Sequence, residues 1–387
     1  MKARKLIAIF VAFATLFTLS ACAAGGDVED YFSDATKPII FANVAPVTGA
    51  RASLGEFAKM GAELFVEQVN AEGGILGRQV EMIYEDDGET EQSSINAMTK
   101  VLERGDVTAI FMNTYSTFTA AEMPLINEYK IPVSSTGSSQ ALLDLESPYF
   151  WMLRPSDAFA GYAVAQAAVN DLGMKNPAVL YCTDAFGAGL HEATMRGLSD
   201  AGIEAAVELS FTVGDQQYQT LLAQVVSSGA DGLIALAHQP DNALIMMQCD
   251  AMGLDVPKIG TASVSSEVCL STAGDSANGW YAVADFTPES PVAETKAFVE
   301  AFRAKFNREP DLHSVWIYDA LLIFKKAIEI AGSTEPEAVN AAIAQVQNLR
   351  GVCTTYSAAE NHEMGMGFMF VVIEDGVGKY ISDINKG

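Results

Sequence analysis

The chain has 387 residues, half of them hydrophobic, and its 49 acidic residues outnumber its 23 basic residues to give a formal charge of −26. This hydrophobic fraction excludes intrinsic disorder, and a length above about 300 residues is typical of two domains. The charge excludes a nucleic-acid-binding surface, because phosphate binding needs clustered Lys and Arg, and no basic run follows Lys5.

The N-terminus has the features of an export signal. Three basic residues among the first five precede an apolar stretch over 6–19, which is shorter than the roughly 20 residues that span a bilayer. The following Leu-Ser-Ala-Cys resembles the bacterial lipobox, in which the Cys is lipidated and becomes the first mature residue. We expect residues 1–21 to be a lipoprotein signal peptide and Cys22 to carry a lipid; the alternative is an ordinary signal peptide cut near Ala21.

Residues 22–37 are rich in Gly, Asp and Ala and are predicted to form a flexible tether. The mature chain has four further cysteines, none in a CxxC pair, and three of them lie in or beside apolar runs. We predict that they are buried free thiols and expect no metal site. These cysteines are Cys182, Cys249, Cys269 and Cys353.

From residue 38 onwards, short apolar runs that predict strands alternate with amphipathic stretches that predict helices. Strands are predicted at 38–44, 79–84, 107–112, 131–134, 178–182, 203–209, 232–237, 258–260 and 280–283. Helices are predicted at 57–69, 91–104, 118–128, 158–172, 188–201, 217–228 and 241–252. This alternation predicts parallel sheets with helices on both faces, an α/β fold.

The order changes after residue 286. Three helical stretches follow in succession, and two late strands come after them; the helices are 293–306, 313–331 and 336–347, and the strands are 354–357 and 368–374. A chain that builds one doubly wound lobe, crosses to a second, returns and crosses again explains this order. The predicted crossings are 154–156, 284–286 and 350–352, so that the N-terminal lobe is 38–154 plus 286–350 and the C-terminal lobe is 155–285 plus 351–387.

The sequence contains none of the common catalytic motifs. The HExxH zinc motif, the Gly-x-Ser-x-Gly elbow, the Walker A loop and a complete dinucleotide-binding glycine pattern are all missing. We therefore predict that the protein is not an enzyme and uses no cofactor.

Several segments match one known family. The most specific is Asn-x-x-Gly-Gly-Ile-x-Gly at 70–77. The others include Ala-Pro-Val-Thr-Gly at 45–49, Tyr-Glu-Asp-Asp at 84–87, Leu-Arg-Pro-Ser-Asp at 153–157 and Gly-Val-Cys-Thr-Thr-Tyr at 351–356. Together they resemble the leucine/isoleucine/valine-type (type I) periplasmic binding proteins over residues 38–374.

The resemblance implies a two-lobed, flytrap-like clamp with a three-crossover hinge and a ligand in the cleft between the lobes, where strand ends and helix N-termini meet. Hinge closure on the ligand would precede docking on a membrane permease. It also implies eight ligand-binding positions. Ser116 would grip a ligand carboxylate at a helix N-terminus, although Ser116 or Thr117 could instead only cap that helix. Gly137 and Ser139 would hold ammonium and carboxylate groups, and Asp157 would accept from an ammonium or act as an N-cap.

The remaining three positions form the walls of the pocket. Leu54 and Phe186 stand where family members often have Tyr, and His238 stands where an aromatic residue facing the cleft is usual; an exposed histidine at a strand end is its alternative. The chain departs from the family after residue 260, where Thr-Ala-Ser replaces an acidic residue that binds the ammonium. A zwitterionic ligand would therefore need Asp157 or Asp285 as a substitute.

The expected function is that of an exported, lipid-anchored, monomeric solute-binding subunit that faces the periplasm or the cell exterior. It would bind an amino acid of the branched-chain type, or a related small carboxylate or amide, and deliver it to the permease and ATPase of an ABC importer. The alternative is a ligand-sensing clamp that signals through a separate membrane receptor.

Overall fold

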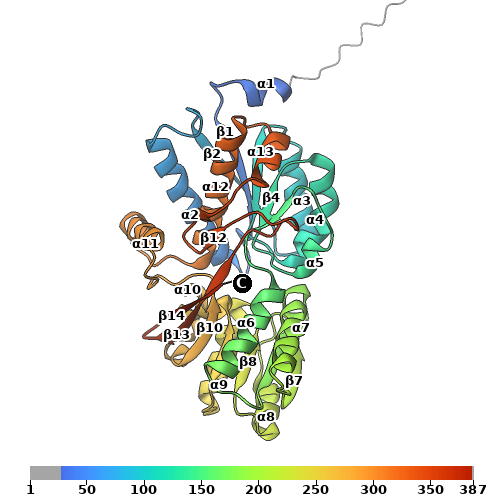
Figure 1. The fold of residues 1–387 in the computed structure, drawn as a ribbon, viewed down its shortest axis with the longest axis vertical. Coiled ribbons are helices and arrows are strands. Elements are labelled where there is room, and N and C mark those ends of the chain that lie inside the picture. The colour runs from blue at the N-terminus through green and yellow to red at the C-terminus, as the bar shows by residue number, and fades with distance from the viewer. Residues whose placement is uncertain (1–27, 386–387) are drawn as a thin grey trace, which may run out of the picture.

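The computed structural model describes residues 28–385, which form two α/β lobes, upper and lower in Figure 1. The strands of the first lobe are β1 (Ile39–Ala45), β2 (Val80–Asp86), β3 (Val107–Met112), β4 (Val133–Ser135) and β5 (Phe150–Met152). They form a parallel sheet in the order β2-β1-β3-β4-β5. Its helices are α2 (Ala52–Ala71), α3 (Glu91–Leu102), α4 (Ser116–Tyr129), α5 (Gln140–Leu143), α11 (Ala293–Phe306), α12 (Leu312–Ala331) and α13 (Pro336–Ile343).

The second lobe holds a seven-stranded sheet in the order β14-β13-β10-β9-β8-β6-β7. Its strands are β6 (Ala178–Cys182), β7 (Val207–Phe211), β8 (Leu233–Leu236), β9 (Lys258–Thr261), β10 (Trp280–Ala284), β13 (Gly367–Glu374) and β14 (Val377–Asn385). Its helices are α6 (Asp157–Asn170), α7 (Ala185–Asp200), α8 (Gln219–Ser228), α9 (Gln239–Ala251) and α10 (Glu267–Ala273). The predicted class of two doubly wound lobes is confirmed; β13 and β14 add an antiparallel edge.

Each face of the first sheet is covered by a different set of helices. Side chains alternate along a strand, so Ile39 and Phe41 of β1 pack in the cluster that contains residues of α2 and α12. Ile40, Ala42 and Val44 pack in the cluster on the α3 and α4 side. Every residue of β1 is therefore buried, as expected for a central parallel strand.

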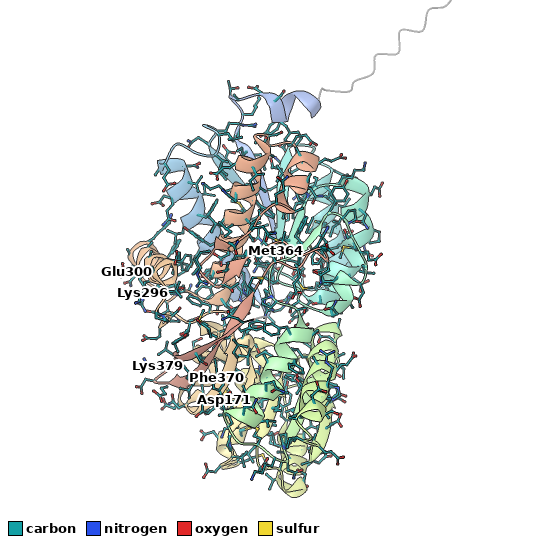
Figure 2. The ribbon with its side chains drawn as sticks, viewed as in Figure 1. Asp171, Lys296, Glu300, Met364, Phe370 and Lys379 are labelled. Atoms are coloured by element: carbon teal, nitrogen blue, oxygen red, sulfur yellow. The ribbon has the colours of Figure 1, made fainter. Side chains whose placement is uncertain are left out.

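The chain changes lobe three times, and the third change lies later than predicted. The expected crossing at 350–352 instead begins a segment that stays with the first lobe: Cys353, Tyr356 and Met364 pack in its core. Backbone bonds join Met152 of β5 to this segment, with Met152 N donating to His362 O and Met364 N donating to Met152 O, both at 2.9 Å. Figure 2 accordingly shows Met364 in the upper lobe, before β13 enters the lower one.

Asp319 of α12 explains why the segment stays. Its carboxylate accepts hydrogen bonds from the backbone N–H groups of Val352 (2.7 Å) and Cys353 (2.9 Å) and from the Tyr356 hydroxyl (2.8 Å). The short strands β11 (Leu349–Arg350) and β12 (Thr355–Tyr356) pair on either side of this anchor. A buried carboxylate with three donors holds the chain on the first lobe until Met364.

The N-terminal part of the described chain also differs from the prediction. Where a tether was expected, α1 (Val28–Ser33) lies at the end of the first lobe that is remote from the second lobe (Figure 1). Arg78 donates from Nη1 to the carbonyl oxygen of Phe32 (2.7 Å) and from Nε to that of Lys37 (2.8 Å), which fixes this segment to the lobe. The predicted signal peptide and Cys22 lie outside the described residues.

The four cysteines at 182, 249, 269 and 353 are buried and free, which confirms that prediction. Across residues 28–385, no helix combines the length and the hydrophobicity that crossing a membrane requires.

Glu122 of α4 is a buried carboxyl group with incomplete hydrogen bonding. Its Oε1 accepts from Ser94 Oγ (2.7 Å), whereas Oε2 has no partner. Burial raises the pKa of Glu122 from its ordinary value of 4.5 to about 8, against the lowering effect of the Ser94 bond. The folded state therefore holds more protons than the unfolded chain between these values, so the contribution of Glu122 to stability is complete below pH 4.5 and is lost as the pH rises through 8.

Glu122→Gln should remove this pH dependence, because the amide stays neutral. In the wild type, Glu122 should lower the free energy of unfolding by up to about 1.4 kcal/mol per pH unit within that window. Denaturant unfolding from pH 4.5 to 8.5 measures the difference, and Glu128→Gln, at an exposed position of the same helix, is the matched control. Parallel profiles for Glu122→Gln and the wild type would contradict the account.

Candidate functional site

A small cavity lies between the two lobes. It is bordered by residues that follow β3 and β4 of the first lobe and β8 and β9 of the second, where the carboxyl ends of the parallel strands meet. The lobes are in contact across it, since the rings of Tyr115 and His238 lie 4.4 Å apart and Ser139 Oγ donates to Ala185 O at 3.2 Å. The space free to the centre of a water molecule is about 50 Å³, which is room for a few water molecules.

Ser116 begins α4 and lines the cavity. Its Oγ accepts a hydrogen bond from the backbone N–H of Ser139 (3.3 Å), which leaves its own proton free to be donated. The N-cap position is Tyr115, and no side chain caps this helix. Ser116 is therefore not the N-cap, and the end of α4 presents backbone donors and the positive end of the helix dipole at the cavity.

The second lobe presents a matching helix end. His238 is the N-cap of α9, which likewise has no side-chain cap bond, and both His238 and Gln239 line the cavity. Asp184 orients the imidazole, with 2.8 Å between Asp184 Oδ2 and His238 Nε2. Phe186 stacks on the His238 ring at 4.6 Å. Burial raises the pKa of Asp184, but the hydrogen bond and charge of His238 outweigh it and lower that pKa to about 2.

Two arginines that sequence reasoning missed also line the cavity. Arg154 Nη2 lies 2.8 Å from Asp285 Oδ2, and its guanidinium lies over the Trp316 ring at 4.4 Å. Asp285, which had been considered as a partner for a ligand ammonium, is therefore already paired with Arg154. Arg51 lies over the Tyr115 ring at 4.0 Å. The Leu-Arg-Pro-Ser-Asp match could have indicated Arg154, but no sequence signal marks Arg51.

Asn113, at the end of β3, is a further residue that the sequence did not indicate. It is 3% exposed and lines the cavity. Asn43 Nδ2 donates both to Phe111 O (3.0 Å) and to Asn113 Oδ1 (3.2 Å), which fixes the orientation of the Asn113 amide. Asn113 Nδ2 then has no partner. A buried donor without a partner at a binding cleft is a candidate ligand contact.

Of the eight positions expected to bind ligand, five line the cavity: Leu54, Ser116, Gly137, Phe186 and His238. Thr117 is half-buried outside the lining, and Ser139 makes the contact between lobes described above. Asp157 is fully buried outside the lining, on the side of α7: a Cβ placed on Gly189 would lie 3.9 Å from Asp157 Oδ2.

Asp157 is not an N-cap, because the N-cap of α6 is Ser156. Neither carboxylate oxygen of Asp157 meets the geometry of a hydrogen bond, although Arg154 and Ser138 lie nearby. Burial raises the pKa of Asp157 to about 7, with Arg154 opposing the rise.

Cys182, Asp184 and His238 bring potential metal-ligand atoms within 4.8 Å of one another. Hydrogen bonds already join them, since Asp184 accepts from Cys182 Sγ (3.2 Å) through Oδ1 and contacts His238 through Oδ2. Burial raises the pKa of the Cys182 thiol, which opposes the thiolate form that metals bind. The hydrogen bonds therefore explain why these three side chains lie together, and their effect is to orient the His238 ring.

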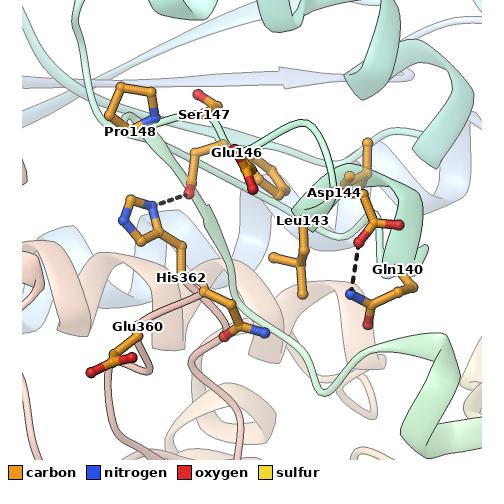
Figure 3. Close-up of a pocket in the computed structure, with 11 residues that line it drawn as sticks. Gln140, Leu143, Asp144, Glu146, Ser147, Pro148, Glu360 and His362 are labelled. Atoms are coloured by element: carbon orange, nitrogen blue, oxygen red, sulfur yellow. Dashed lines mark hydrogen bonds between the residues drawn. The ribbon is translucent and has the colours of Figure 1, made fainter.

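A larger cavity, of about 540 Å³, lies on the first lobe between α5 and the 360–362 loop (Figure 3). Some of its polar groups bond to their neighbours: Gln140 Nε2 donates to Asp144 Oδ1 (3.3 Å), and His362 Nδ1 pairs with Phe150 O (3.0 Å). Only the first lobe and the segment packed on it contribute to this lining. The smaller cavity between the lobes is the candidate site, because groups from both lobes converge there.

Comparisons with known proteins identify relatives of this chain. A leucine-, isoleucine-, valine-, threonine- and alanine-binding protein of Pseudomonas aeruginosa is 26% identical over 314 residues, which cover 81% of this chain and 83% of that protein. A branched-chain amino acid transporter substrate-binding protein of Streptococcus pneumoniae, solved with isoleucine, superposes with a TM-score of 0.82 at 22% identity and covers 89% of this chain and 100% of its own.

A solute-binding protein of an ABC transporter from R. palustris, solved with benzoate, also has a TM-score of 0.82, at 19% identity, and covers 90% of this chain and 96% of its own. At these identities the solved structures show a shared fold. The profile of the periplasmic binding protein family matches residues 38–377. The chain therefore belongs to the periplasmic binding protein family, whose members are extracytoplasmic solute-binding proteins and not enzymes.

Proposed function

We propose that this protein is the solute-binding lipoprotein of an ABC importer, and that it binds an amino acid of the branched-chain type or a related small carboxylate or amide between its lobes and delivers it to the permease. The observation that carries the proposal is the meeting of the α4 and α9 N-termini, one from each lobe, at a closed cavity. Such ends attract carboxylates, and a ligand that contacts both lobes stabilises the closed state. The Pseudomonas relative and the structures solved with isoleucine and benzoate support this range of ligands.

The proposed division of roles follows from the geometry. Ser116 and the α4 backbone N–H groups hold the carboxylate of the ligand. Leu54, Phe186 and His238 form the apolar and aromatic walls around the rest of the ligand. Because Asp184 fixes the His238 ring against Phe186 and Tyr115, these walls are largely preformed in the closed state.

Native mass spectrometry of freshly purified protein should reveal a retained small carboxylate, amino acid or amide. Adding that compound at about 100 times its Kd should stabilise the fold by ~2.7 kcal/mol, because a ligand that binds only the folded state shifts the unfolding equilibrium. Thermal unfolding with and without the compound measures the shift. If the compound is instead consumed with turnover, the proposal of a binding protein fails.

Ser116→Ala should weaken the binding of this compound roughly 10- to 150-fold, because one hydrogen bond to a charged group, about 1.5–3 kcal/mol, is lost. Ser116 does not cap α4, but its Oγ accepts from the buried Ser139 N–H, so the free energy of unfolding of the ligand-free protein should fall by about 1 kcal/mol, less than the loss in binding. Isothermal calorimetry and denaturant unfolding separate the two effects. Thr117→Ala, one residue along α4 and outside the cavity, is the matched control; an equal loss of affinity in both variants would refute the role of Ser116.

The membrane anchor is a separate proposal that rests on the Leu-Ser-Ala-Cys sequence alone. Cys22→Ala should release mature protein into the soluble fraction, because the residue that would receive the lipid is missing. Fractionation of cells that express either form tests this. Equal membrane retention of the variant and the wild type would remove the anchor from the proposal.

A further inference from the structure

Within residues 28–385, the cavity between the lobes is lined by basic side chains and by no acidic side chain. Among the described residues that line it, two are Arg and two are His, and none is Asp or Glu. These basic residues are Arg51, Arg154, His238 and His313. They come from both lobes, so a ligand in the cleft has basic side chains on both sides.

The acidic partners of these groups stand behind them, outside the lining. Asp285 pairs with Arg154 at 2.8 Å, and Asp184 contacts His238 at 2.8 Å. Asp311 contacts His313 Nδ1 at 2.6 Å, and Asp87 lies 3.3 Å from Arg51. A ligand ammonium would lose its water in this cavity without meeting a carboxylate, and burial of an unpaired charge is strongly unfavourable.

The neutral groups at the cavity point to the same preference. No side chain caps the N-terminus of α4 or of α9, although Pro240 in the first turn of α9 has no N–H to donate, and Asn113 adds a buried Nδ2 that has no partner. Two backbone carbonyls beside the cavity are already used as acceptors. The carbonyl oxygen of Ser138 accepts from the N–H of Asp157 (2.7 Å), and that of Thr136 accepts from Arg154 (3.4 Å).

From this arrangement we infer that the cleft binds a small carboxylate that has no ammonium group, and that it discriminates against the matching amino acid and the matching amide. The inference rests on the proposed function, which places the ligand in this cleft. The helix ends, Ser116 and Asn113 satisfy the oxygens of the carboxylate, and the missing lining acid leaves an ammonium unpaired. A neutral amide loses the attraction of the helix dipoles and brings an NH₂ group to a surface of donors.

The test compares head groups on one carbon skeleton. Calorimetric Kd values are measured for 4-methylpentanoate, leucine and 4-methylpentanamide, and for 3-phenylpropanoate, phenylalanine and 3-phenylpropanamide. In at least one series, the carboxylate should bind at least tenfold more tightly than both its amino acid and its amide. The six compounds separate the effect of the head group from that of the side chain.

Asn113→Asp sharpens the test, since the new carboxylate is nearly isosteric. It can still accept from Asn43, but it replaces the unpartnered donor with an anionic oxygen. The affinity for the carboxylate should fall at least tenfold, and the preference over the amino acid should shrink. Asn96→Asp adds the same charge at an exposed site of the first lobe and keeps the bond from Gln92, so it should leave all Kd values unchanged.

The outcomes separate the inference from the proposed function. Tighter binding of leucine or phenylalanine than of its carboxylate would overturn the inference and leave the proposed function standing. Equal Kd values for carboxylate and amide would also overturn it. If none of the six compounds binds and native mass spectrometry finds no amino acid, small carboxylate or amide, the proposed function fails and the inference fails with it.

Discussion

The ion pair between Arg154 and Asp285 joins two of the places where the chain changes lobe. Arg154 follows β5, where the first crossing begins, and Asp285 follows β10, where the second begins. Two nitrogens of the guanidinium contact Asp285 Oδ2, at 3.0 and 2.8 Å, and a third donates to Ser138 Oγ at 3.0 Å. The third connection is tied in beside them, because Glu363 Oε1 accepts from Ser156 N. The hinge is thus a set of cross-linked chain segments, and one of its residues, Arg154, also lines the cleft.

The alternation of apolar runs and amphipathic helices was sufficient to predict two parallel-sheet lobes, because each strand buried on both faces leaves a clear local pattern. Features that depend on distant partners were not predictable. The segment at 351–364 stays with the first lobe because of the Asp319 carboxylate, which is remote in sequence. Strand β14 is only partly buried and has no continuous apolar run; its signal was the Asp-Gly pair at 375–376, which has positive φ at both residues, as a tight hairpin turn requires.

The site shows the same division. Ser116 could be predicted because it follows a strand and opens a helix, which is a local pattern. Arg51 lies over the Tyr115 ring, and the Asn113 amide is oriented by a hydrogen bond from Asn43. No linear motif records either contact. The protein as a whole is strongly anionic, yet the described lining of its cleft contains two Arg and no Asp or Glu. The two facts are compatible, because surface charges more than about 8–10 Å away are screened by salt, whereas the contacts inside the closed cleft are not.

The burial of the four thiols links the rate at which they react to the rate at which the fold opens. Burial raises the pKa of Cys182, Cys249, Cys269 and Cys353, so in the folded state they are both inaccessible and protonated. An extracytoplasmic protein meets oxidants, and thiolates are the species that react with them. The rate of oxidation is therefore limited by how often the chain opens. Each time a thiol is exposed, its oxidation competes with reclosing of the fold. The rate at which a thiol reagent labels these cysteines under native conditions therefore measures how often the fold opens.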